Sequence, residues 1–287
     1  MTQSAVRFEQ VRKSFGRRAV LQGIDLDIAA GMSFGLVGIN GAGKTTLIKC
    51  LLDFCHVDAG GIEIFGTRHT DSRARARLAF LPERFMPPYF LTGRDFLGYM
   101  LALDERAADE DKVRAMFAAL DLDAAALDQP VRAYSKGMTQ KLGLAASLLA
   151  EPDLLILDEP MSGLDPLARA RVKQLLRQLR DRGRTLFFTS HALSDVEEIC
   201  EQMVVLHQGR LRFSGSPREL MLRYAPKEVL LGYAPQVSIP LPRSRSTGDG
   251  KVPTSSGGPD LRSPTLGYAG DSMEQAFLKC IESAVHG

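Results

Sequence analysis

The chain has 287 residues, of which 45% are hydrophobic and 24% are charged, and its formal net charge is +2 at pH 7. This length suits one large domain with an appendage, and the nearly balanced charge gives no reason to expect a nucleic-acid partner. No apolar run approaches the roughly 18 residues that would span a bilayer, and residues 1–10 lack the apolar core of a signal peptide. We therefore expect a globular, intracellular protein without a membrane span.

The N-terminal part of the chain predicts a small antiparallel β layer followed by a buried strand and a helix. Residues 5–11 and 24–28 alternate apolar and polar side chains, which is typical of half-exposed strands. Residues 32–37 form a continuous apolar run that predicts a buried strand, and a helix is expected over residues 46–52. Further short strands are expected over residues 61–65 and 78–81.

A glycine-rich loop connects the buried strand to this helix. It reads Gly-x-x-x-x-Gly-Lys-Thr from Gly38 to Thr45, and this pattern between a strand and a helix is the context of a P-loop. Glycines let backbone N–H groups turn toward a phosphate chain, Lys44 can reach the β- and γ-phosphates, and the Thr45 hydroxyl can hold Mg²⁺. The sequence therefore predicts a site for ATP and Mg²⁺ formed by Gly38, Asn40, Gly41, Ala42, Gly43, Lys44, Thr45 and Thr46.

A second signal is a buried strand that ends in two acidic residues. Residues 154–157 are apolar and are followed by Asp158 and Glu159. The first acid can hold Mg²⁺ opposite the glycine loop, and the second can act as a general base that activates water. Between the two signals, residues 84–150 are rich in Ala, Leu and Met and predict a helical subdomain inserted into an α/β core.

The region after the two acids predicts a helix, a strand and a hairpin. Asp165 is a suitable N-cap, Pro166 suits the first helical turn, and Gly183 is a suitable end for this helix. A strand is then expected over residues 185–190. A hairpin is expected from the two short apolar runs 204–206 and 211–213.

The composition changes after the hairpin. Residues 226–271 are rich in Pro, Ser and Gly and predict a flexible linker. Residues 272–287 predict an amphipathic helix, with Ser272 and Gln275 as a capping box. This helix either docks on the core or binds a partner, and its pattern alone does not separate these two possibilities.

Together these signals resemble the ATP-binding cassette of ABC transporters, over about residues 5–222. Residues 134–140 read Tyr-Ser-Lys-Gly-Met-Thr-Gln. They resemble the signature sequence of the family, usually LSGGQ, with Ser135 and Gly137 retained and Lys136 in place of the first glycine. This form is similar to that of exporter-type cassettes of the ABC-2 group.

Three further motifs follow the order of the family. Residues 162–165 read Ser-Gly-Leu-Asp and match the D-loop, which includes Asp165. His191 follows Thr-Ser and matches the switch histidine, which can donate a hydrogen bond to the γ-phosphate. Phe15 occupies the position of the aromatic residue that stacks on adenine, a contact that typically contributes roughly 1–3 kcal/mol.

The resemblance implies an α/β fold over residues 1–225: a P-loop NTPase core with an antiparallel β subdomain and an inserted helical subdomain. It also implies a dimer that holds two ATP molecules head to tail. In that dimer Ser135 and Gly137 open a helix whose N–H groups and dipole face the nucleotide of the other cassette. A homodimer is the expected form.

The partner implied by the resemblance is a multispanning transmembrane permease on a separate polypeptide. The cassette would then lie at the cytoplasmic face of the inner membrane as a peripheral subunit and power export. The alternative is a soluble ABC-type ATPase that acts in translation or DNA repair. Translation-type members usually carry two cassettes, and DNA-repair members carry a long coiled coil between the two nucleotide motifs, for which this chain has no room.

One residue departs from the family pattern. Glu83, in Leu-Pro-Glu, stands where most members carry the glutamine of the Q-loop. A carboxylate can still offer oxygen to Mg²⁺, so Glu83 is a candidate metal ligand and catalytic residue, although its charge puts normal coupling in doubt. The following residues 87–90, Pro-Pro-Tyr-Phe, are expected either on the surface that meets the permease or in a rigid turn.

Overall fold

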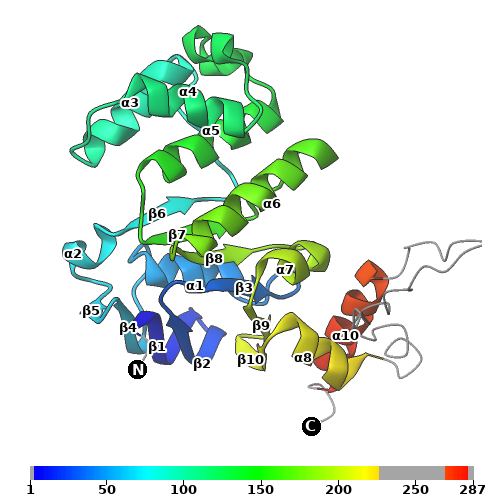
Figure 1. Cartoon of the computed structure of the whole chain (residues 1–287). Helices are drawn as coiled ribbons and strands as arrows, with labels where there is room; N and C mark the ends of the chain where they lie inside the picture. The colour runs from blue at the N-terminus through cyan, green and yellow to red at the C-terminus, as the bar shows by residue number, and fades with distance from the viewer. Residues whose placement is uncertain (1–2, 226–268, 284–287) are drawn as a thin grey trace, which may run out of the picture.

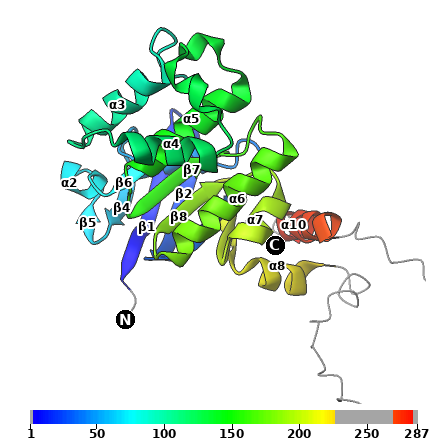
Figure 2. The same ribbon diagram turned by 45° about the horizontal axis from the view of Figure 1, so that its top comes forward.

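Two β sheets and a group of helices make up the structure, a computed structural model that describes residues 3–225 and 269–283 (Figure 1). One sheet is antiparallel with strand order β2-β1-β4-β5, and the other has the order β10-β9-β3-β8-β7-β6. Helices α3, α4 and α5 gather at one end of the molecule (Figures 1 and 2). The predicted fold class, a P-loop NTPase core with an antiparallel β subdomain and an inserted helical subdomain, is confirmed.

The antiparallel sheet has longer strands than the sequence indicated. Its strands are β1 (Ser4–Phe15), β2 (Arg18–Ala29), β4 (Ala59–Ile64) and β5 (Thr67–Arg68). A tight turn at Gly16, with φ 59°, joins β1 to β2. The buried side chains of this sheet, such as Val6, Phe8 and Ile28, share one hydrophobic cluster with Leu47 of the helix that follows the glycine loop. This packing holds the sheet against the helix that follows the glycine loop.

The second sheet is parallel except for its last strand. Its strands are β3 (Ser33–Val37), β6 (Leu78–Leu81), β7 (Leu154–Asp158), β8 (Thr185–Thr189), β9 (Gln202–His207) and the antiparallel β10 (Arg210–Gly215). Every residue of β3, β7 and β8 is buried, which explains their continuous apolar runs. Because the parallel strands end at one edge, the loops after β3, β6, β7 and β8 meet there.

Helices cover this sheet. They are α1 (Lys44–Leu51), α2 (Ser72–Arg75), α6 (Pro166–Asp181), α7 (Leu193–Ile199) and α8 (Pro217–Tyr224). The cap predicted for α6 is confirmed, because the Asp165 carboxylate accepts a hydrogen bond from the Ala168 N–H at 2.9 Å. No helix within the described ranges, 3–225 and 269–283, is long and apolar enough to cross a membrane.

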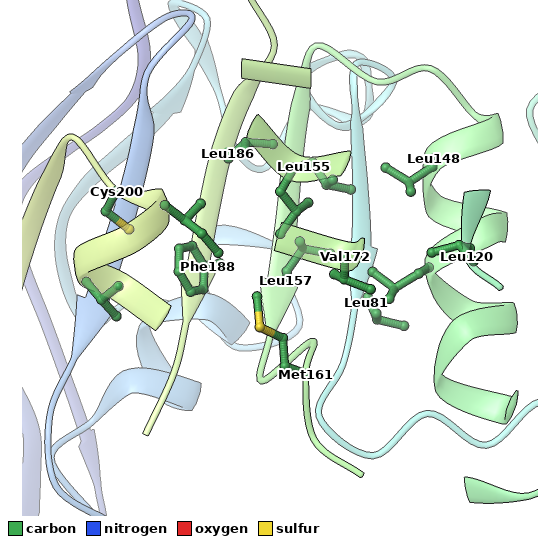
Figure 3. Close-up of a cluster of buried hydrophobic side chains, with 14 of the residues drawn as sticks. Leu81, Leu120, Leu148, Leu155, Leu157, Met161, Val172, Leu186, Phe188 and Cys200 are labelled. Carbon is green, nitrogen blue, oxygen red and sulfur yellow. The ribbon is translucent and has the colours of Figure 1, made fainter. Parts of the chain in front are cut away.

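The helical group lies within the range that the sequence assigned to an inserted subdomain. It contains α3 (Gly93–Leu103), α4 (Glu110–Ala119), two 3₁₀ turns (Ala124–Asp128 and Val131–Ala133) and α5 (Lys136–Leu149). In Figure 3, Leu155 and Leu157 of β7 lie between Phe188 of β8 on one side and Leu120 and Leu148 of the helical group on the other. One apolar cluster therefore joins this group to the sheet.

The C-terminal helix α10 (Ala269–Ser283) docks on the core (Figure 1). It packs against α8 and α7 through Met273, Ala276, Cys280 and Ile281, all of which are buried. The helix begins at Ala269, so the prediction that Ser272 is its N-cap was wrong, and residues 269–271 belong to the helix rather than to the predicted linker. The rest of that linker and the predicted helical residues 284–287 lie outside the described residues.

The docked face of α10 gives a stability prediction. Met273→Ala should lower the free energy of unfolding by about 2–5 kcal/mol, because the substitution leaves a cavity at a fully buried site. Leu278→Ala is the matched control on the same helix: this side chain is 53% exposed, so its truncation should cost well under about 1 kcal/mol. Urea denaturation of the full chain measures both values. Equal, small losses would contradict docking of α10 in solution.

Candidate active site

A cleft of about 270 Å³ opens at the edge where the parallel strands end. It combines residues from the glycine loop, from the ends of β6, β7 and β8, and from the β1–β2 hairpin. Its lining consists of Phe15, Arg18, Val20, Asn40, Gly41, Ala42, Gly43, Lys44, Thr45, Thr46, Glu83, Asp158, Glu159 and His191. Most of the predicted site residues are thus brought together in one place.

The glycine loop leaves the N-terminus of α1 open. The N-cap of α1 is Gly43, with φ 114°, and no side chain caps the first N–H groups of this helix. A side chain at Gly38 is excluded as well, because a Cβ there would lie 2.4 Å from the Leu206 carbonyl oxygen. Uncapped N–H groups at a helix N-terminus bind anions, so the loop fits a phosphate group.

Lys44 is held inside this loop. Its side chain is 8% exposed, and Nζ donates hydrogen bonds to the carbonyl oxygens of Gly38 at 2.6 Å and Ile39 at 3.5 Å. Burial lowers the pKa of Lys44, while the nearby carboxylates of Glu159, Asp158 and Glu83 oppose that shift. The ammonium group therefore stands between the glycine loop and three acids.

Thr189, at the end of β8, connects the two acids at the end of β7. Its Oγ1 donates a hydrogen bond to Asp158 Oδ1 at 2.6 Å and accepts one from the Glu159 N–H at 3.1 Å. Burial raises the pKa of Asp158, and this hydrogen bond partly offsets the rise. Thr189 is not among the residues that the sequence predicted for the site. Its signal is positional, because Asp158 and Thr189 are register partners in adjacent strands.

Glu159 has an unusual backbone and an unsatisfied carboxylate oxygen. Its φ of 51° is left-handed, a conformation that is uncommon for residues other than glycine. Oε1 is buried without a hydrogen bond to any described residue, and His191 Nε2 lies 3.5 Å from it. Burial raises the pKa of Glu159, and the positive charge of His191, when protonated, opposes this. An unpartnered oxygen at a cleft can accept a proton from bound water.

Two further predicted residues complete the walls of the cleft. Glu83 follows the edge strand β6 and lines the cleft beside the acids of β7. Phe15, at the end of β1, is 54% exposed, and Lys13 Nζ lies 5.4 Å from the centre of its ring. The exposed ring face leaves room for a planar group to stack on it.

Four predicted residues are not among those that line the cleft: Gly38, which begins the glycine loop, and the more distant Ser135, Gly137 and Asp165. Ser135 caps α5, its Oγ accepting a hydrogen bond from the Met138 N–H at 3.2 Å, and Asp165 caps α6. The two loops touch each other, because a Cβ on Gly137 would lie 3.2 Å from the Gly163 carbonyl oxygen. Within one chain Ser135, Gly137 and Asp165 form a separate surface and do not join the nucleotide loop.

The residues of the cleft fit ATP and Mg²⁺ as the groups to be bound. The open N-terminus of α1 and the Lys44 ammonium suit a phosphate chain. The Thr45 hydroxyl and the Asp158 carboxylate both line the cleft, and oxygen ligands of this kind suit Mg²⁺, which is usually held by one or two carboxylates together with substrate phosphates.

Comparison with known proteins places this arrangement in a family. The family model described as "ABC transporter" matches residues 21–162. The Nod factor export ATP-binding protein I of Paraburkholderia xenovorans is 36% identical over 230 residues, which cover 77% of this chain and 74% of that protein. The chain belongs to the ABC transporter ATP-binding protein family.

Other relatives agree with this assignment. An uncharacterized ABC transporter ATP-binding protein of Synechocystis sp. is 39% identical over 205 residues, and the match covers 70% of this chain but only 58% of that relative. A solved structure described as the ATP binding subunit of an ABC transporter matches with a TM-score of 0.71 and 26% identity, covering 77% of this chain and 93% of that one. The cassette therefore shares its fold with known ATP-binding subunits.

The Thr189 hydrogen bond gives a pH prediction. Thr189→Val removes the donor that lowers the pKa of Asp158, so this pKa should rise further and Asp158 should become protonated at a higher pH. The acid limb of the ATPase pH profile should consequently move to higher pH, by up to about 1 unit.

Thr185→Val is the matched control, because Thr185 lies at the other end of the same strand, where its Oγ1 accepts a hydrogen bond from the Gly31 N–H. That variant should leave the position of the acid limb unchanged. An identical shift in both variants, or none in Thr189→Val, would show that Thr189 does not tune the acids.

Proposed function

We propose that this cassette is the ATP-hydrolysing subunit of an exporter whose transmembrane permease is a separate polypeptide. The observation that carries the proposal is the single cleft that joins the open N-terminus of α1 with Lys44, Asp158, Glu159 and His191. The export-related name of the Paraburkholderia relative supports the direction of transport.

Binding of ATP would use the glycine loop and its flanking residues. The N–H groups of residues 40–46 and the Lys44 ammonium would hold the phosphates, and Phe15 would stack on adenine. Thr45, Asp158 and Glu83 would hold Mg²⁺, which neutralises charge on the phosphates when bound. Gly38 contributes through its carbonyl oxygen, which accepts the Lys44 hydrogen bond and orients that side chain.

Hydrolysis would depend on Glu159 and His191. The unpartnered Oε1 of Glu159 is available to accept a proton from an attacking water molecule, and the raised pKa makes this carboxylate a stronger base than a solvated one. Thr189 fixes the backbone N–H of Glu159 and thereby the direction of its side chain. His191, 52% exposed and 3.5 Å from Glu159, would donate a hydrogen bond to the γ-phosphate.

A second cassette would complete the site. Ser135 and Gly137 open α5 on a surface outside the cleft, and Asp165 lies in the loop beside them. Two copies arranged head to tail would bring the α5 N-terminus of one copy to the nucleotide of the other. ATP binding would then close the dimer and hydrolysis would reopen it, which converts chemistry into motion of the permease.

The contact with the permease would lie near Glu83, at the entry to the helical group. Met86, Tyr89 and Phe90 are 85%, 67% and 68% exposed, and an apolar patch of this kind is typical of an interaction surface. Such a contact would place the cassette peripherally at the cytoplasmic face of the inner membrane. The alternative, a soluble ABC-type ATPase, predicts co-purification with ribosomes or DNA from cell extracts, whereas the transporter predicts a multispanning partner in detergent extracts.

Mutation can separate the role of the proposed base, Glu159, from that of the proposed phosphate-binding residue, Lys44. Glu159→Gln should bind ATP, accumulate as an ATP-bound dimer and hydrolyse at least roughly a hundredfold more slowly, because a positioned base is lost. Lys44→Ala should instead weaken nucleotide binding itself. Steady-state ATPase assays, nucleotide titration and size-exclusion chromatography measure these effects. Wild-type turnover in Glu159→Gln would remove this residue from the chemistry.

Glu83 is expected to act as a Mg²⁺-linked sensor. Because a carboxylate holds Mg²⁺ more strongly than an amide oxygen, Glu83→Gln should raise the Mg²⁺ concentration for half-maximal ATPase several-fold and largely keep turnover. Glu83→Ala should impair turnover and uncouple it from the permease. The control is Glu105→Gln, an exposed acid of the helical region. If the Ala variant keeps its Mg²⁺ dependence, coupling and turnover, Glu83 has no role in the site.

A further inference from the structure

Arg18 lies at the mouth of the cleft, on the hairpin that also carries Phe15. It is the first residue of β2, and the register pairs it directly with Phe15 across the turn. Both side chains line the cleft. The guanidinium group extends toward the glycine loop, because a Cβ placed on Gly41 would lie 3.9 Å from Arg18 Nη2. Arg18 is therefore close to the backbone that surrounds the phosphate chain.

No described residue forms an ion pair or hydrogen bond with the Arg18 side chain, whereas two other basic side chains of this region have partners. Lys13 Nζ holds Asp58 Oδ1 at 2.9 Å, and Arg210 Nη2 donates to Gln22 Oε1 at 3.0 Å. Arg18 also borders a second cavity of about 290 Å³, which shares Val20 and Gly41 with the cleft. The guanidinium group thus has open space around it and all its donors available.

Acidic side chains line the cleft, so binding of a triphosphate would be favoured by a second cation besides Lys44. Glu83, Asp158 and Glu159 are acidic, and a triphosphate adds further negative charge to them. Lys44 already donates hydrogen bonds to two loop carbonyl oxygens. The other permanently charged cation among the lining residues is Arg18. A planar guanidinium group matches phosphate oxygens with two parallel N–H donors.

We infer that Arg18 is a further phosphate-binding residue, which contacts the phosphate chain of the nucleotide beside the glycine loop. The inference rests on the proposed function, since it assumes that the cleft binds a nucleotide. The two residues of the hairpin then have different roles. Phe15 contacts the base and Arg18 contacts the phosphates, so one hairpin binds both ends of the nucleotide.

The test uses nucleotides with different numbers of phosphates. Adenosine, AMP, ADP and ATP are titrated into the full chain and into Arg18→Ala, Arg18→Lys and Arg17→Ala, under conditions without turnover. Arg17 is the matched control, because it is an exposed arginine in the same hairpin turn and does not line the cleft. Thermal melting of each variant confirms that the fold is kept.

We expect Arg18→Ala to weaken ATP binding about tenfold, the scale of a hydrogen-bonded charge pair. The loss should shrink as phosphates are removed and vanish with adenosine. Arg18→Lys should recover part of the affinity, and Arg17→Ala should change it less than about twofold. The inference would be overturned if Arg18→Ala left the ATP affinity unchanged, or if Arg18→Ala and Arg17→Ala lost equal ATP affinity. It would also be overturned if Arg18→Ala lost as much affinity for adenosine as for ATP. Failure of the wild-type chain to bind ATP would instead overturn the proposed function, and the inference with it.

Discussion

The register of the parallel strands is the constraint on which the site depends. β8 lies between β3 and β7, and its last residue, Thr189, pairs with Asp158 at the end of β7. The glycine loop follows β3, so it meets the two acids of β7 across the single strand β8. A one-residue change of register would turn Asp158 toward the opposite face of the sheet. Every residue of β3, β7 and β8 is buried, so a change of register would force the side chains on both faces of these strands to repack.

The same burial sets the electrostatics of the cleft. Folding removes most of the hydrating water from three charged side chains, those of Lys44, Asp158 and Glu159. This desolvation lowers the pKa of the lysine and raises the pKa of each acid. Each charged group is partly compensated by a fixed neighbour, through the loop carbonyl oxygens for Lys44 and the Thr189 hydroxyl for Asp158. At Glu159 the charges of protonated His191 and of Lys44 offset part of the rise, while the Oε1 atom has no hydrogen bond among the described residues.

The C-terminal helix extends the core toward the same site. Phe277 and Leu278 of α10 border a cavity of about 250 Å³ that is also lined by Ile39 of the glycine loop and by His191. The buried face of α10 meanwhile packs on α7, the helix that begins two residues after this histidine. The histidine therefore lies between the nucleotide cleft on one side and a wall formed by α10 on the other.

The sequence by itself determined the elements whose signals are local. The glycine loop from Gly38 to Thr45 lies between a strand and a helix, and an apolar strand ends at the acids Asp158 and Glu159. A glycine loop and a buried strand each have a short-range signature, so both could be recognised without knowledge of the fold. The cap at Asp165 is equally local. The helix start at Ser272 was misassigned, because its capping pattern lies inside a longer helix that begins at Ala269.

Only the tertiary structure decided which residues meet. Thr189 and Arg18 were not predicted site residues, and strand pairing places one beside Asp158 and the other beside Phe15. Glu83 reaches the cleft because β6 pairs with β7. Ser135 and Asp165 belong to the motifs of the family, yet one chain holds them away from the cleft. Such relations depend on contacts between residues far apart in the sequence, and neither composition nor local periodicity contains that information.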